Sequence, residues 1–135
     1  MAKVDPQKYI DFVNQVTSQE SKDGVAFVSR LRDLEGDDCD IHRLLTAAVG
    51  ISAEGGEFME IVKKIIFQGK PYNKDTIHHM QIELGDVMWY LAQACMALDT
   101  NFDELMAMNV EKLGKRYPEG AFEVGYSENR QEGDL

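Results

Sequence analysis

Apolar residues recur along this chain at intervals of three and four residues, which is the period of an α-helix. The first apolar segment follows Asp5 and Pro6, a pair typical of a helix start, and it predicts a helix over about residues 5–18. A second segment, with apolar residues at positions 27, 28, 31 and 34, predicts a short helix that stops near Gly36. The chain therefore opens with two predicted helices.

Two longer helical segments follow. The apolar pattern is continuous from Asp40 to Phe67, and a glycine and a proline in the sequence QGKPYN then end it. Asn73 is the predicted N-cap of the next helix, which covers about residues 74–98. Because only a short turn joins these two helices, we expect them to lie antiparallel with their apolar faces together.

The last helical segment begins at Asn101 or near Asp103 and ends at Pro118. No segment alternates apolar and polar residues for long enough to predict a sheet. We therefore predict an all-α protein, an antiparallel helical bundle with a four-helix core and short accessory helices, in which residues 1–120 form a single domain. Residues 121–135 show no helical period and are predicted to form an irregular tail that lies over the surface or a partner.

Composition and charge narrow the classes of protein. A chain of 135 residues with 44% hydrophobic residues suits one globular domain. Cys39 and Cys95 lie far apart and lack the spacing of a zinc or disulfide framework. No apolar run approaches the roughly 18 residues of a membrane span. We therefore expect a cytoplasmic protein. The net charge of −10 disfavours nucleic acid as a partner. A polyanionic small substrate would need cations to bind.

Acidic residues interrupt the apolar faces of both long helices. On the wheel of the first, Glu54 lies inside the apolar arc, Glu57 lies about 60° away at its rim, and Glu60, about 120° away, faces out. On the wheel of the second, Glu83 lies inside the apolar arc and Asp86 lies about 60° away at its rim. Each helix thus carries one inward acid and a second acid three residues later.

A cation is the expected partner of these acids. Burying an unpaired carboxylate costs several kcal/mol, and four carboxylates between two helices would repel one another. Oxygen ligands favour Mg²⁺ or Mn²⁺ over zinc. Two other interpretations are a pair of solvated helix faces in an acid-rich chain and a di-iron site, whose Glu-x-x-His spacing the chain lacks.

Three short motifs carry a resemblance to a known enzyme family. The sequences EGGE at 54–57 and ELGD at 83–86, separated by 25 residues, match the ExxE…ExxD pattern of the MazG-like all-α nucleoside triphosphate pyrophosphohydrolases. The sequence NVEKLGKRYPEGAF at 109–122 resembles a later segment of the same family. The resemblance covers roughly residues 44–130, and the chain is most similar to short bacteriophage-encoded members, which implies the host cytoplasm as its location.

The resemblance implies an activity and a set of site residues. It implies a Mg²⁺-dependent enzyme, with Mn²⁺ as a substitute, that cuts a (deoxy)nucleoside triphosphate between the α- and β-phosphates and releases the monophosphate and pyrophosphate. By position it makes four acids both metal ligands and catalytic residues: Glu54, Glu57, Glu83 and Asp86. Many members have another glutamate where this chain has Ala53, so the resemblance does not extend to a third metal site or a base there. We expect a water molecule to attack in line while a cluster glutamate accepts its proton, and the sequence leaves open which glutamate does so.

Polar residues of the last helix are the predicted phosphate contacts. Asn109, Lys112 and Arg116 follow one edge of its apolar face, and Lys64 lies near the Glu57 side of its own helix. The alternatives are that Lys112 and Arg116 are solvated residues that favour the helix dipole, and that Lys64 is a surface lysine.

Other residues have weaker signals. The candidates for a nucleobase pocket are Tyr9, Phe12 and Tyr90. Trp89 faces away from Glu83 on the wheel and is assigned to packing or to a subunit contact. His79 lies one turn before Glu83 and is either a hydrogen-bond partner of that carboxylate or a structural histidine.

Self-association and substrate identity complete the predictions. Some helices are apolar on more than one side, and the family resemblance points to a homodimer or homotetramer. The phage-like resemblance favours a deoxynucleotide, dGTP or dCTP, as substrate. The alternatives are a hydrolase of another nucleotide pyrophosphate, such as an alarmone, and a non-catalytic helical interaction protein with a structural cation.

Overall fold

The computed structural model describes residues 1–130 and 132–133, and throughout those residues the regular structure is helical. The all-α class predicted from the sequence is therefore confirmed. The chain divides into two compact units, Met1–Ile41 and His42–Leu135. Each unit is described separately below, and the single domain over residues 1–120 stays a prediction.

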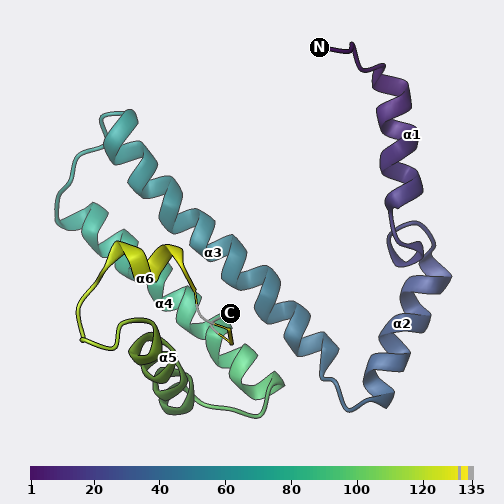
Figure 1. Ribbon diagram of the computed structural model, residues 1–135. Helices are drawn as coiled ribbons and strands as arrows, with labels where there is room; N and C mark the ends of the chain where they lie inside the picture. The colour runs from purple at the N-terminus through teal and green to yellow at the C-terminus, as the bar shows by residue number, and fades with distance from the viewer. Residues whose placement is uncertain (131, 134–135) are drawn as a thin grey trace. The chain divides into compact units, whose positions relative to one another are not determined.

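The N-terminal unit contains two helices and a short 3₁₀ turn (Figure 1). Helix α1, Pro6–Val16, begins as predicted, because the Asp5 side chain accepts a hydrogen bond of 2.9 Å from the backbone N–H of Gln7. The turn η1, Gln19–Ser21, packs against α2, Gly24–Gly36. Helix α2 ends at Gly36, as the sequence predicted.

The second unit is built on two long helices. Helix α3 covers Ile41–Phe67, and the chain then turns at Gly69, whose φ of 68° lies in the left-handed region that glycine adopts without strain. Helix α4 covers Lys74–Ala97. The predicted cap Asn73 begins α4, because its side chain accepts backbone hydrogen bonds of 3.1 Å from the second and third residues of the helix. These bounds agree with the sequence prediction.

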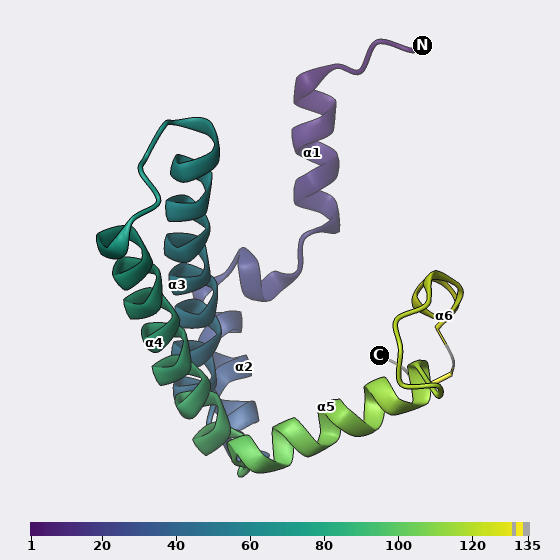
Figure 2. The same ribbon diagram turned by 90° about the vertical axis from the view of Figure 1, so that its left-hand side faces the viewer.

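Helices α3 and α4 lie antiparallel and side by side, as both ribbon views show (Figures 1 and 2). Arg43 of α3 donates a hydrogen bond of 2.8 Å from Nη1 to Oε1 of Gln93 in α4. Gly50 of α3 is buried against the ring of Tyr90 in α4, at a distance that leaves no room for a side chain on Gly50. The predicted antiparallel pair is therefore present.

Two helices follow the long pair. Helix α5, Phe102–Arg116, begins at Asn101, whose side chain accepts a hydrogen bond of 3.0 Å from the backbone N–H of Glu104. Of the two starts considered for this helix, the structure selects Asn101. The short helix α6, Val124–Glu128, lies within the segment 121–135 that was predicted to be irregular.

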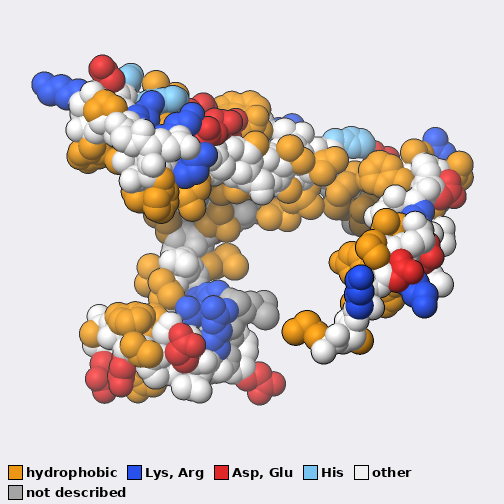
Figure 3. All heavy atoms as spheres, turned by 90° about the horizontal axis from the view of Figure 1, so that it is seen from above, with side chains coloured by type: hydrophobic (Ala, Val, Ile, Leu, Met, Phe, Trp, Pro, Cys, Tyr) orange, Lys and Arg blue, Asp and Glu red, His pale blue; other side chains and the backbone are white. Residues whose placement is uncertain are grey.

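Many large apolar side chains are exposed. Hydrophobic side chains occupy broad areas of the surface in the space-filling view (Figure 3). The buried apolar side chains among the described residues include Ala47 and Ile61 of α3 and Cys95 of α4. Among the helices of the described residues, none combines the length and the hydrophobicity of a membrane-spanning segment.

Candidate functional site

Three of the four predicted acidic ligands meet between α3 and α4. Glu54 of α3 and both Glu83 and Asp86 of α4 each offer a carboxylate oxygen, and these oxygens all lie within 4.8 Å of one another. Glu54 and Glu83 are partly buried and Asp86 is exposed. Glu83 and Asp86 share one side of α4 because residues three apart are neighbours on a helix surface. The antiparallel pairing of the helices places Glu54 opposite them.

The fourth predicted ligand stands slightly apart from this group. Glu57 is exposed, and it is not among the acids whose oxygens converge within 4.8 Å. Its charge still acts on Glu54, where it contributes to a raised pKa. Its position agrees with the rim of the apolar arc, where the helical wheel placed it.

Crowding of like charges alters the chemistry of Glu54. Partial burial raises the pKa of this carboxyl above its ordinary value of 4.5, and the negative charges of Asp86, Glu83 and Glu57 raise it further. A hydrogen bond between the Glu54 and Glu83 carboxyl groups raises it as well. The site therefore favours a positive charge among these carboxylates.

The donor set suits a hard divalent cation. Oxygen ligands from carboxylates match the preference of Mg²⁺ and Mn²⁺, and an ion among Glu54, Glu83 and Asp86 would relieve the repulsion that raises the pKa of Glu54. The carboxylates present thus fit the cation that the sequence predicted.

His79 supports one member of the acidic group. Its Nε2 lies 2.9 Å from Oε1 of Glu83, one turn along α4, and the Glu83 side chain is 12% exposed. A histidine that donates to a metal-binding carboxylate fixes the orientation of that carboxylate. Of the two interpretations of His79, the structure favours a hydrogen-bond partner of Glu83.

An aromatic wall adjoins the acids. A cavity of about 370 Å³ is lined by Glu54 and Asp86 together with Trp89 and Tyr90. Tyr90 was predicted as a candidate for a nucleobase pocket, whereas Trp89 was assigned elsewhere because it lies far from Glu83 on the wheel. Measured from Asp86, Trp89 is only three residues away, which makes the two side chains neighbours on the helix. The spacing of three residues between Asp86 and Trp89 is the sequence feature that could have identified Trp89.

The predicted phosphate contacts are less closely gathered. Lys64 donates a hydrogen bond of 2.8 Å to Oε1 of Glu60, and this pairing raises the pKa of Lys64. Asn109 of α5 lines a second hollow, of about 410 Å³, with Leu91 of α4 and apolar residues of α5. Lys112 and Arg116 are half-buried residues farther along α5. These placements leave the phosphate-binding role of all four residues a prediction.

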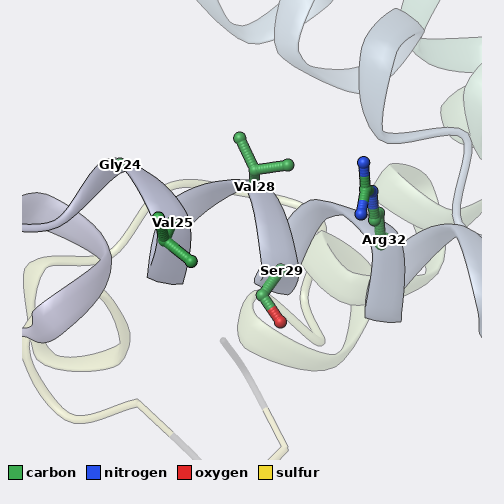
Figure 4. Close-up of a pocket in the computed structure, with 5 residues that line it drawn as sticks. All are labelled: Gly24, Val25, Val28, Ser29 and Arg32. Carbon is green, nitrogen blue, oxygen red and sulfur yellow. The ribbon is translucent and has the colours of Figure 1, made fainter.

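Another hollow lies on α2 in the N-terminal unit. Its volume is about 420 Å³, and all five residues that line it belong to this one helix. Val28 and Arg32 point one way from the helix while Val25 and Ser29 point the other way (Figure 4). The lining contains no acid and a single cation, so this hollow lacks the chemistry of the site between α3 and α4.

Comparisons with known proteins agree with this site. A family profile described as the MazG nucleotide pyrophosphohydrolase domain matches residues 43–121, a range that contains the acids, the aromatic wall and α5. The chain is also 36% identical over 95 residues to the "Gene 37 protein" of Mycobacterium phage L5, an alignment that covers 69% of this chain and 82% of that protein. No solved structure matches.

The profile match spans more than half of the chain, and its range includes both acidic motifs at 54–57 and 83–86. Members of this family generally depend on a divalent cation, which agrees with the converging carboxylates of Glu54, Glu83 and Asp86. The chain belongs to the MazG nucleotide pyrophosphohydrolase family, and it is therefore a hydrolase that acts on the pyrophosphate bonds of nucleotides.

Proposed function

We propose that the chain hydrolyses a deoxynucleoside triphosphate between its α- and β-phosphates and releases the monophosphate and pyrophosphate. The observation that carries the proposal is the convergence of Glu54, Glu83 and Asp86 within 4.8 Å between α3 and α4. A triphosphate and a group of carboxylates are both strongly negative, so only divalent cations can hold them together. Mg²⁺ is the proposed ion, and Mn²⁺ is its proposed substitute.

Each acid has a role in this proposal. Glu54, Glu83 and Asp86 hold the ion, and Glu57 completes the set from the rim of α3. The bound ion supplies positive charge that polarises the phosphoryl oxygens and makes water a better nucleophile. Water attacks the α-phosphorus in line, a glutamate of the set accepts its proton, and the bond from the α-phosphorus to the bridging oxygen breaks as pyrophosphate leaves. His79 keeps Glu83 in the orientation that the ion requires.

Cationic and amide side chains take up the phosphate charge that faces away from the ion. Asn109, Lys112 and Arg116 share one edge of α5, and they are the proposed phosphate contacts. Lys64 already donates to Glu60, so in this proposal it contacts phosphate only by exchanging that partner. Arg116 is the strongest phosphate donor of the set because its guanidinium can bind two oxygens at once.

The nucleobase is the least specified part of the substrate. The relative from Mycobacterium phage L5 places a similar protein in a bacteriophage, and a phage enzyme acting in the host cytoplasm would meet deoxynucleotides. We propose dGTP or dCTP as substrates on this ground. Alarmones and phosphoribosyl-ATP also contain pyrophosphate bonds of nucleotides, so they belong in the same assay.

Self-association is part of the proposal. Several large apolar side chains on α3 and α4 are more than half exposed: Leu45, Val49, Met59, Ile66, Met88 and Met96. Exposed apolar patches of this kind mark interaction surfaces. We propose that a second copy of the chain covers them, in a homodimer or homotetramer. Sedimentation equilibrium measures the mass directly, and a monomer at micromolar concentration would contradict this part of the proposal.

Pyrophosphate release tests the activity. Purified protein is incubated with each deoxynucleoside triphosphate, with alarmones and with phosphoribosyl-ATP, in Mg²⁺ and in EDTA. We expect release that requires Mg²⁺ and that Glu54→Gln or Asp86→Asn abolishes, because each variant removes a charge from the acidic group. Glu60→Gln is the matched control, since Glu60 pairs with Lys64 and lies outside the group. Equal release by wild type and the two site variants would reject the proposed site.

A further inference from the structure

We propose that Trp89 is a substrate-contact residue, and that its indole ring provides the face on which the nucleobase stacks. This inference rests on the proposed function, because it concerns the same site. The proposed function names residues that bind the phosphates, and this inference names a residue that binds the base.

Trp89 stands directly next to the acidic group. It follows Asp86 by three residues on α4, and it lines the cavity of about 370 Å³ with Asp86, Glu54 and Tyr90. Two acids and two aromatic side chains therefore line the same cavity. A ligand that fills it must combine a charged group held through a cation with a planar apolar group a short distance away. A nucleoside triphosphate has this construction.

The ring of Tyr90 is fixed by the backbone of α3. A Cβ atom added to Gly50 would lie 2.0 Å from Cδ1 of Tyr90, so the ring rests on the helix where a side chain is missing. Gly50 is buried, and it lies one turn before Glu54 on α3. This contact holds Tyr90 against α3, the helix that also carries Glu54.

Tyr90 in turn braces Trp89. Their ring centroids lie 4.9 Å apart and their planes cross at 83°, an edge-to-face arrangement. In this geometry Tyr90 covers at most one face of the indole, so at least one face is left for another ring. Trp89 is 56% exposed, which is a large exposure for the largest apolar side chain. A braced ring with an uncovered face is suited to stacking.

A nucleobase is the occupant that the surroundings select. Every base has a flat face that stacks on an aromatic side chain, and such a stack does not require hydrogen bonds to the edges of the base. A second copy of the chain is the competing occupant of an exposed tryptophan. The cavity shared with Glu54 and Asp86 favours the base, because the phosphates of the same molecule would be held there.

Trp89 is the single tryptophan of the chain, so its fluorescence reports on this site alone. Wild-type protein in Mg²⁺ is titrated with non-hydrolysable α,β-imido deoxynucleoside triphosphates and, separately, with inorganic tripolyphosphate. We expect nucleotides to quench the emission and tripolyphosphate to leave it unchanged, because only nucleotides carry a base. Equal responses to both probes, or no response to any nucleotide, would overturn the inference.

Kinetics provide the second arm. Trp89→Ala should raise KM about tenfold or more while kcat changes little, because a base–aromatic stack contributes to binding and does not enter the chemical step. Trp89→Phe should recover most of the affinity, since it restores an aromatic face. The control is Ile82→Ala, which alters another apolar residue of α4 that is 48% exposed and lies outside both the cavity lining and the proposed subunit contact. An unchanged KM in Trp89→Ala would overturn the stacking role, and a lower assembly mass with an unchanged KM would assign Trp89 to a subunit contact.

The two proposals fail in different ways. If wild type releases no pyrophosphate from any nucleotide, the proposed function is wrong. If wild type releases pyrophosphate while Trp89 fluorescence ignores the nucleotide, only the stacking role is wrong.

Discussion

Replacing Gly50 with alanine probes how α3 and α4 meet beside the acids. The added Cβ would lie 2.0 Å from Cδ1 and 2.3 Å from Cγ of Tyr90, far inside van der Waals contact. The nearer atoms belong to the base of the ring as well as its edge, so rotating the ring alone cannot remove the overlap. Either Tyr90 must leave its position or the helices must separate.

The magnitude follows from two opposing effects. Overpacking a filled site costs about 1–3 kcal/mol, while alanine gains about 0.5–1 kcal/mol over glycine inside a helix. Gly55 lies on the same helix with nothing within 4 Å of its Cβ position, so Gly55→Ala should show the helix gain alone. We therefore expect Gly50→Ala to be about 1–3 kcal/mol less stable than Gly55→Ala, which corresponds to a Tm about 4–12 °C lower.

Thermal unfolding followed by circular dichroism in EDTA measures this difference without the contribution of metal binding. Tyr90→Ala supplies a second check, because the cost of Gly50→Ala should disappear when the ring is absent. If Gly50→Ala is as stable as Gly55→Ala, or if Gly50→Ala still lowers the stability when Tyr90 is alanine, the Tyr90 ring does not pack against Gly50 as described.

Three further predictions concern the metal, its supporting histidine and a helix cap. The folded pKa of Glu54 lies above 4.5, so between the folded and unfolded pKa values the folded chain binds more protons than the unfolded chain, and the Tm without metal should fall as pH rises through that window. Mg²⁺ should restore the Tm most at the alkaline end of the window. A pH-independent Tm would refute this reasoning. His79→Ala should weaken Mn²⁺ binding, measured by electron paramagnetic resonance, about tenfold or more, whereas the control His78→Ala should not weaken it. Equal Mn²⁺ affinities of the two variants would contradict the role of His79. Asn73→Ala should lower the free energy of unfolding by about 1 kcal/mol in urea titrations, and no loss would mean that the cap of α4 is dispensable.

The helices were predictable because their signals are local. Asp5, Asn73 and Asn101 cap α1, α4 and α5 through hydrogen bonds to residues two or three positions away, and such contacts are determined by the adjoining sequence. The short helix α6 was not predicted, since five residues are too few to show a period.

The acids were predictable for a related reason. Spacing within each helix placed Glu54 and Glu83 inward, and a short connection brought the two helices together. The pairing of Lys64 with Glu60 was also within reach of the sequence, because residues four apart on a helix are neighbours.

The aromatic wall could not be predicted in the same way. The contact of Gly50 with Tyr90 depends on how far α3 slides along α4, and neither the helical period nor the length of the loop determines that register. Trp89 was assigned elsewhere because its direction was judged from Glu83 alone, although the helix also places it beside Asp86. The packing of α3 on α4, and not the local sequence, determines which of these side chains meet.

The order of the elements has a consequence for how the enzyme is made. Glu54, Glu83 and Asp86 all belong to one helical hairpin, whose two arms are neighbours in the chain and are joined only by the turn at Gly69. Hairpins of this kind have low contact order and form quickly. The proposed ion-binding acids can thus assemble during synthesis as soon as α4 has emerged, before α5 and its proposed phosphate contacts are complete. A newly synthesised chain would therefore be able to bind the ion before it can bind the nucleotide.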